Sequence, residues 1–245
     1  MKTLIIANWK MNPKSLKEAQ ELFEVVKAGV KKNKNVEVVI CPPFMYLPAL
    51  INKGLAIGAQ NCHWEAQGAY TGEVSPAMLA DAGAEYIILG HSERRRYLGE
   101  TDEIINLKLK AALKARLKPI ICIGEKEGEG IESVVENQLT KILVNIPGGQ
   151  LKNIIIMYEP VWAISTTAGC KKCSPDEALS ASLFIRRVIA KLYSRFFSDQ
   201  ITIVYGGSVD SKNIADYVVK AGLAGALVGA ASLKAEEFIK IVKTL

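Results

Sequence analysis

Eight short apolar segments recur along the chain, and each is followed by a helical pattern or by a loop that leads to one. Val, Ile and Leu dominate these segments, as is typical of strands buried on both faces of a parallel sheet. Eight βα units in 245 residues predict the α/β class and a closed (β/α)8 barrel, with eight parallel strands surrounded by helices in a single domain, 1–245. The expected strands are Thr3–Asn8, Val36–Cys41, Ala56–Asn61, Tyr86–Gly90, Pro119–Ile123, Ile154–Glu159, Ile201–Tyr205 and Ala226–Gly229.

An open doubly wound sheet is the main structural alternative. It would favour a Gly-rich phosphate loop after the first strand, but here that strand ends in Asn8-Trp9-Lys10. Helix starts are marked by two expected capping boxes, Ser15 with Glu18 and Ser174 with Glu177. No Pro/Ser-rich linker interrupts the pattern, so one domain is expected.

The composition argues against several classes of function. The net charge of +6 comes from scattered lysines, and no basic stripe with interleaved aromatics predicts nucleic-acid binding. No apolar run approaches the roughly 20 residues that span a bilayer, so no membrane association is expected. Asn8 and Lys10 interrupt the apolar start too early for a signal peptide, which favours a cytoplasmic protein. The five cysteines do not form a disulfide framework.

Glu159 follows an apolar strand and stands beside Pro160 and close to Trp162. A carboxylate walled by apolar rings loses hydration and becomes a usable base near neutral pH. Taken alone, a glutamate after a strand is more often a plain surface residue.

Three further polar residues follow strands at the same end of the predicted barrel, where barrel enzymes place their chemistry. Asn8 and Lys10 follow the first strand, and His91 follows the fourth. His91 precedes an expected helix start, whose positive end disfavours imidazolium, so a neutral ring is expected to polarise a carbonyl. Lys10 would stabilise the oxygen that becomes anionic. Together with Glu159, the set indicates proton abstraction next to a carbonyl.

The ends of the last two strands suit a phosphate group. Tyr205-Gly-Gly-Ser-Val209 exposes backbone amides and a hydroxyl, and Leu227–Lys234 leads into a short helix. Barrels bind phosphate with the loops after strands seven and eight, through amides at a helix start. Each turn alone could be only a tight turn.

Five segments together resemble the signature segments of the triosephosphate isomerase family, in order and over the whole chain. They are Ala7-Asn-Trp-Lys-Met-Asn12, Gly90-His-Ser-Glu-Arg-Arg95, Tyr158-Glu-Pro-Val-Trp-Ala163, Tyr205-Gly-Gly-Ser-Val209 and Leu227-Val-Gly229. A glutamate base with a neutral histidine is a known example of tuned acid–base groups in that family.

The resemblance implies a TIM barrel that interconverts dihydroxyacetone phosphate and D-glyceraldehyde 3-phosphate in glycolysis and gluconeogenesis, without metal or cofactor. It implies that Glu159 moves the proton, that His91 shuttles hydroxyl protons, and that Lys10 and Asn8 stabilise the enediolate. The residues it implies as supporting this set are Glu93, Ser92 and Tyr205, and those it implies at the phosphate are Ser208, Gly207, Gly229, Ala230 and Ser165.

The resemblance also implies a homodimer. The segment Gln60–Glu73 resembles the family's dimer loop, in which the counterpart of Thr71 reaches the neighbouring subunit's site. Glu73 and Arg94 are expected to support this interface. The alternative is an ordinary long surface loop that forms no interface, but the large apolar side chains of Trp64 and Tyr70 would then be exposed to solvent.

The loop after strand six departs from the family, which usually reads Ala-Ile-Gly-Thr-Gly-Lys there. Between Ala163-Ile164 and Lys171, the chain has six residues, Ser165 to Cys170, where the family has three. The family's loop closes as a rigid lid over the substrate, so a weaker closed state is expected. Cys170 and Cys173 in this loop could form a redox switch, with lysines favouring the thiolate, although incidental cysteines are the simpler interpretation.

Two alternatives remain open. One is a barrel enzyme acting on a larger sugar phosphate, although the loops after strands two and five are short. The other is a non-catalytic or impaired relative kept as a binding or scaffolding protein, although the set of Asn8, Lys10, His91 and Glu159 is intact.

Overall fold

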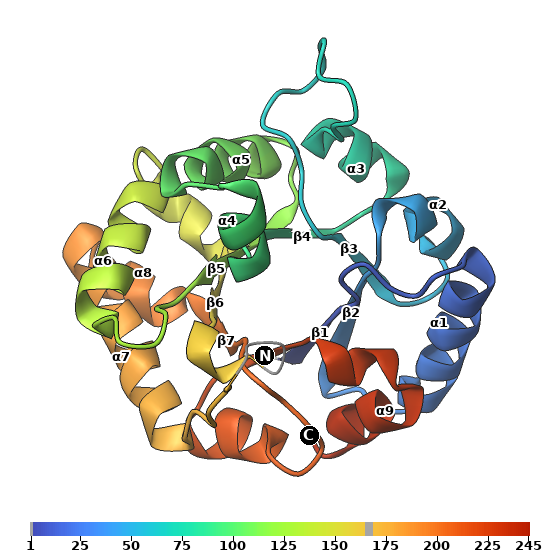
Figure 1. Ribbon diagram of the computed structural model, residues 1–245. Coiled ribbons are helices and arrows are strands. Elements are labelled where there is room, and N and C mark those ends of the chain that lie inside the picture. Colours follow the sequence, from blue (N-terminus) through green and yellow to red (C-terminus); the bar gives the residue numbers. More distant parts are fainter. Residues whose placement is uncertain (1, 165–168) are drawn as a thin grey trace.

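The computed structural model describes residues 2–164 and 169–245, and its strands close into a parallel barrel (Figure 1). Each strand pairs with the next along the chain, and β8 pairs with β1. The predicted fold class is therefore confirmed. The strands are β1 (Thr3–Asn8), β2 (Val36–Cys41), β3 (Ala56–Ala59), β4 (Tyr86–Leu89), β5 (Lys118–Ile123), β6 (Ile155–Tyr158), β7 (Thr202–Tyr205) and β8 (Gly225–Val228).

The first two strands have the predicted bounds, whereas most later strands end earlier than predicted. Gly90 lies outside β4 because its φ of 73° is left-handed, a conformation that glycine adopts without steric cost. Glu159 follows β6 rather than ending it. The chain therefore leaves the sheet just before these site residues, which places their side chains at the mouth of the barrel.

Helices surround the strands in Figure 1. Ser174 and Glu177 form the predicted capping box at the start of α7. At the start of α1, Ser15 accepts the N–H of Glu18, but the carboxylate of Glu18 accepts the N–H of Lys14, so that box is incomplete. The α-helices are α1 (Leu16–Val30), α2 (Leu47–Leu50), α3 (Pro76–Ala82), α4 (Ser92–Leu98), α5 (Asp102–Lys114), α6 (Ile131–Ile142), α7 (Pro175–Leu192), α8 (Arg195–Gln200) and α9 (Ala235–Lys243).

Shorter helical turns fill several connections. They are 3-10 turns, except for a π-helical turn at Asp216–Lys220 after β7. The 3-10 turns span Phe44–Tyr46, Gly148–Asn153, Val161–Ala163 and Ala230–Leu233. The turn at Val161–Ala163 begins directly after Glu159 and Pro160, so the chain changes direction immediately behind the carboxylate.

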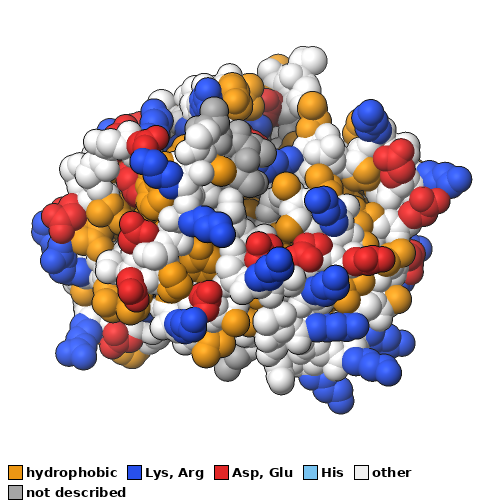
Figure 2. All heavy atoms as spheres, turned by 60° about the horizontal axis from the view of Figure 1, so that its bottom comes forward, with side chains coloured by type: hydrophobic (Ala, Val, Ile, Leu, Met, Phe, Trp, Pro, Cys, Tyr) orange, Lys and Arg blue, Asp and Glu red, His pale blue; other side chains and the backbone are white. Residues whose placement is uncertain are grey.

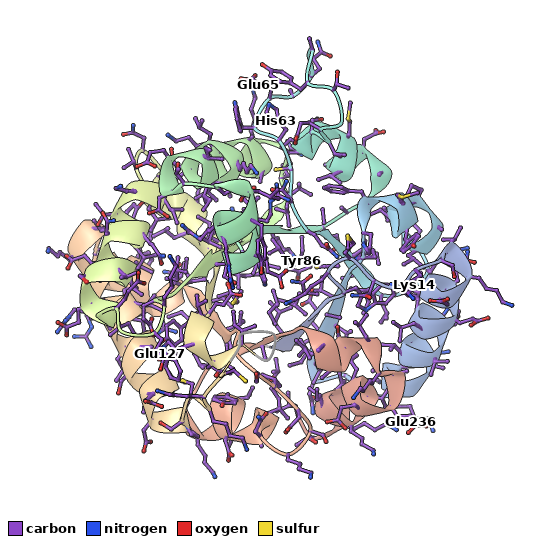
Figure 3. The ribbon with its side chains drawn as sticks, in the orientation of Figure 1. Lys14, His63, Glu65, Tyr86, Glu127 and Glu236 are labelled. Carbon is purple, nitrogen blue, oxygen red and sulfur yellow. The ribbon has the colours of Figure 1, made fainter. Side chains whose placement is uncertain are left out.

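Two apolar cores hold the fold together. One fills the barrel interior with side chains such as Ile6, Ile88, Met157 and Val204, and the other lies between the strands and the helices. Tyr86 belongs to the interior core and lies within the ring of strands in Figure 3. Burying each of these side chains contributes about 1.5–3 kcal/mol.

The surface is charged and mixed. On the face shown in Figure 2, basic and acidic side chains lie interspersed with small apolar areas. None of the helices within the described ranges is long and apolar enough to cross a membrane.

Candidate active site

A cavity of about 460 Å³ opens at the carboxyl ends of the strands. Lys10, His91 and Glu159 line it together with the loops after β7 and β8. These groups come from strands one, four, six, seven and eight, so closure of the barrel brings together residues that are far apart in the sequence.

Glu159 is 2% exposed and lies at the base of this cavity. Its position depends on Gly124 at the end of β5, where a Cβ atom would come within 2.0 Å of the carbonyl oxygen of Glu159. Only glycine permits the two strand ends to approach this closely. The backbone N–H of Glu159 donates to the carbonyl of Ile123, which fixes the glutamate against β5.

The carboxylate of Glu159 is buried but fully engaged. Oε2 accepts the backbone N–H of Ser92 at 3.1 Å, and Oε1 accepts the Ser92 hydroxyl at 2.9 Å. His91 Nε2 lies 3.1 Å from the same Oε1. The sequence predicted a carboxylate that loses hydration, and the structure adds polar donors at the start of α4, which replace the lost water.

His91 is the N-cap residue of α4, and its ring orientation follows from that position. The backbone N–H of Glu93 points at Nδ1 over 3.3 Å. A ring nitrogen that accepts a hydrogen bond carries no proton, so the proton of a neutral ring lies on Nε2. Nε2 is the atom that faces Glu159 and the cavity, so a neutral His91 presents a donor there.

Lys10 is held in a strained conformation with a φ of 53°, which is rare for a residue with a side chain. Its backbone N–H donates to Asn8 Oδ1 at 3.0 Å, and its carbonyl accepts from Gln60 at 2.8 Å. Its ammonium group lies 2.5 Å from Glu93 Oε1. Asn8 itself is buried and is not among the residues that line the cavity, so its side-chain oxygen serves the backbone of Lys10 in this structure.

The loops after β7 and β8 form the opposite wall. Gly207, Gly229 and Ala230 line it, and their amides donate no hydrogen bond to another described residue. Ser208 differs, because both its amide (3.1 Å) and its hydroxyl (2.8 Å) donate to the carbonyl of Ala163 in the loop after β6. Three amides that have no acceptor among the described residues, together with a lysine on the same cavity, make a site that suits an anion.

A sequence model described as triosephosphate isomerase matches residues 3–245 of this chain. A protein named triosephosphate isomerase from Carboxydothermus hydrogenoformans is 48% identical over 99% of this chain and 98% of its own length. Proteins of the same name from Alkaliphilus oremlandii (46%, 98% of both chains) and Clostridium botulinum (45%, 99% of both chains) are similar over the same extent. The chain belongs to the triosephosphate isomerase family.

Within this triosephosphate isomerase fold, Glu125 anchors the base of the loop after β6. Its Oε1 accepts the indole N–H of Trp162 at 2.7 Å and the hydroxyl of Tyr158 at 3.0 Å. The N–H of Lys171 donates to the carbonyl of Trp162, which ties the two ends of the loop together. Ser165, expected at the phosphate, lies outside the described residues.

Cys170 and Cys173 are both free thiols, the first exposed and the second buried. Burial raises the pKa of Cys173 to about 12. The expectation that neighbouring lysines favour the thiolate is therefore wrong for Cys173, because desolvation by burial is the largest cause of its shift and favours the neutral thiol. Tyr205 lines the cavity as well, and burial raises the pKa of its hydroxyl well above the usual range.

The expected interface loop extends outward from the barrel between β3 and α3 (Figure 1). Thr71 and Glu73 are exposed on it, and Tyr70 stays 44% exposed. His63 stacks on Tyr70 with ring centroids 4.4 Å apart, and Figure 3 shows His63 and Glu65 on this extension. Arg94, by contrast, pairs with Glu100 of its own chain at 2.5 Å.

Sequence reasoning did not single out several residues that line the triosephosphate isomerase site. Lys172, Lys234, Asp210 and Glu237 lie on its rim. Glu237 accepts the N–H of Ser211 at 2.7 Å, and this hydrogen bond lowers the pKa of its carboxyl. Their positions in the sequence could have indicated this placement, because most of them follow β7 or β8, whose loops form part of the cavity. Within the described ranges, no group of three His, Cys, Asp or Glu side chains is placed to hold a metal ion.

Proposed function

We propose that this protein interconverts dihydroxyacetone phosphate and D-glyceraldehyde 3-phosphate in the cytoplasm, as an intramolecular aldose–ketose isomerase. Membership of the triosephosphate isomerase family supports the reaction. The observation that carries the mechanism is the approach of His91 Nε2 to Glu159 Oε1 at 3.1 Å, in the cavity that Lys10 and the loops after β7 and β8 also line.

In the first step, the carboxylate of Glu159 removes a proton from C1 of dihydroxyacetone phosphate. The C–H electron pair forms the C1–C2 double bond, and the C2 carbonyl oxygen becomes the enediolate oxygen. The Nε2–H of His91 and the ammonium of Lys10 are the donors that stabilise this charge. Asn8 contributes by holding the strained backbone of Lys10.

In the second step, His91 redistributes the hydroxyl protons between O1 and O2. Glu159 then returns its proton to C2, which gives the aldehyde at C1. No atoms are gained or lost, and the residues named here account for every proton that moves. Since Glu159 is bonded to Ser92 before substrate arrives, its carboxylate leaves those donors to reach the carbon. The substrate carbonyl replaces it as the acceptor for His91.

The phosphate of the substrate binds to the amides of Gly207, Gly229 and Ala230. Ser208 joins them after it releases the Ala163 carbonyl, which couples phosphate binding to the loop after β6. Ser165 is proposed to contribute from the tip of that loop. With six residues where the family usually has three, the tip is expected to give a weaker closed state than is typical of the family.

The working unit is proposed to be a homodimer. Large apolar side chains are exposed after β1 and β2, including Met11, which is 92% exposed, and Met45, which is 85% exposed. Thr71 is proposed to reach the partner subunit's Asn and Lys, with Glu73 at the interface. Arg94 supports it indirectly, through Glu100 and the buried Lys108 beneath the loop.

A coupled assay of isomerisation in both directions tests the proposal. Turnover with both triose phosphates is expected, together with its loss in Glu159→Gln. If the purified dimer binds triose phosphate but turns over neither substrate, the protein is instead a non-catalytic relative that serves as a binding protein.

A further inference from the structure

A second cavity, of about 160 Å³, lies at the opposite end of the barrel from the site described above. It is formed by the amino-terminal ends of the strands and by the turn Gly148–Asn153. Residues from β1, β2, β4, β5, β6 and β7 all reach it, so it lies across the barrel axis. This is the end of the barrel that in such folds ordinarily serves stability.

The charged residues that line this cavity are mostly basic. Lys2, Lys118 and Lys152 face it, and Glu37 is the acidic one among the described residues that line it. None of the three ammonium groups pairs with a carboxylate elsewhere in the described chain. Their positive charge is therefore not neutralised by an ion pair within the described chain.

The single carboxylate is occupied by its neighbour. The hydroxyl of Tyr86 donates a short hydrogen bond to Glu37 Oε1. Burial, followed by the hydrogen bond to Glu37, raises the pKa of Tyr86 well above its usual range, so the hydroxyl stays neutral. Lys118 Nζ donates to the Tyr86 oxygen at 3.1 Å and lies 4.6 Å from the centre of its ring. This contact uses one of the three ammonium protons and leaves two for another acceptor.

We propose that this cavity is a second anion site, which takes a small phosphate dianion at the amino-terminal mouth of the barrel. Lys118 and Lys152 supply the charge, Lys2 closes the side next to β1, and the hydroxyl of Thr202 faces the same space. Three ammonium groups against one engaged carboxylate leave a positive excess that a dianion neutralises. The volume suits inorganic phosphate or a small phosphate ester and is too small for a nucleotide.

Binding stoichiometry tests the site. Inorganic phosphate, and in a second series glycerol phosphate, is titrated by calorimetry into the wild-type dimer and into Lys118→Met/Lys152→Met. The expected result is two sites per chain in the wild type and one in the double variant, with affinity at the lost site falling at least about tenfold. The two ligands distinguish free phosphate from a phosphate ester as the preferred occupant.

Two variants separate this site from the active site. Lys34→Met removes an exposed lysine at the same end of the barrel but outside the cavity, and should keep both sites. Lys10→Met should lose only the active-site anion. Turnover of the double variant should stay within about twofold of wild type, because its substitutions lie at the far end of the barrel.

The proposal is overturned if the wild type and Lys118→Met/Lys152→Met bind phosphate with equal stoichiometry and affinity. Failure of the proposed function would look different, as loss of turnover with both anion sites retained. If the double variant does not fold, wild-type crystals soaked in tungstate decide the question. Density between Lys118 and Lys152 supports the site, and density confined to the active site refutes it.

Discussion

Nε2 of His91 lies 3.1 Å from Oε1 of Glu159, so the proposed electrophile and the proposed base are in contact before substrate arrives. Ser92 donates twice to the same carboxylate. The start of α4 therefore supplies the proposed acid, His91, and also the donors that hold the proposed base, Glu159, before substrate binds. Substrate must separate the two, which makes the geometry of this helix start central to turnover.

Glu159→Gln should lower kcat about 10³-fold, since the amide cannot accept the carbon-bound proton. KM should change only a few-fold, because the phosphate contacts are untouched. Steady-state kinetics in both directions measure this. Ser92→Ala is the matched control, because it removes the hydroxyl but keeps the backbone donor, and its kcat should fall less than about tenfold. Equal losses in the two variants would contradict the assignment of Glu159 as the base.

Glu93 should act as a positioning residue for Lys10, since its carboxylate lies 2.5 Å from the ammonium group. Lys10→Met should lower kcat/KM about 10²-fold or more, as expected for loss of a charge that stabilises an oxyanion. Glu93→Gln should lower it about tenfold, and Glu93→Asp should recover part of that loss. A Glu93→Gln enzyme with unchanged kcat/KM would show that Lys10 needs no such anchor.

The barrel could be predicted from sequence because its signal is local and repeated. Bulky apolar segments such as Val36–Cys41, followed by helix starts, define each βα unit without knowledge of its neighbours. Strand ends were less accurate, because residues such as Gly90 leave the sheet through a backbone conformation that the apolar pattern does not encode.

From the sequence, it was possible to predict which residues come together in the site, but not the hydrogen bonds between them. The order of strand ends placed Lys10, His91 and Glu159 at one mouth, and the structure brings them together there. The resemblance named Ser92 as a supporting residue, but its two hydrogen bonds to Glu159 were not predicted, because they form only when β4 and β6 meet β5 on barrel closure. The buried pair of Glu100 and Lys108 has no local signature for the same reason.

Lys108→Met should destabilise the protein by about 3–5 kcal/mol, the cost of breaking a buried ion pair. Lys108 is 4% exposed, and its ammonium group contacts Glu100 and donates to Asn61 at 2.8 Å. Urea unfolding at fixed protein concentration measures the loss. Adding Glu100→Gln should restore part of the stability, and an additive double variant would show that the two side chains are not coupled.

Alkylation should distinguish the two cysteines in the loop after β6. Iodoacetamide at pH 8 should modify Cys170, which is exposed, and spare Cys173. The thiolate is the nucleophile, and burial raises the pKa of Cys173 to about 12, so at pH 8 that thiol stays protonated. Mass spectrometry of peptides after timed labelling gives the readout. Labelling of Cys173 as fast as Cys170 would contradict the raised pKa, and Cys170→Ser should remove the fast phase.

Shortening the tip after β6 should raise catalytic efficiency. Replacing Ser165–Cys170 with the three-residue tip typical of the family removes the extra chain between two fixed ends, Trp162 and Lys171, which are already joined by a backbone hydrogen bond. Flexible extra residues cost well under ~1 kcal/mol of closure entropy, so a larger gain would come from better placement of the phosphate-binding amide, worth up to about 10²-fold. The methylglyoxal released per turnover should fall at the same time, because it forms when the enediolate eliminates its phosphate, and a tighter lid retains the enediolate in the site until it is protonated. Turnover and by-product are measured together in wild type and the shortened variant, with Cys170→Ser in the full-length loop as the control for loss of the thiol alone. Wild-type rates and by-product equal to those of the shortened enzyme would show that the longer tip closes as well as the family's own.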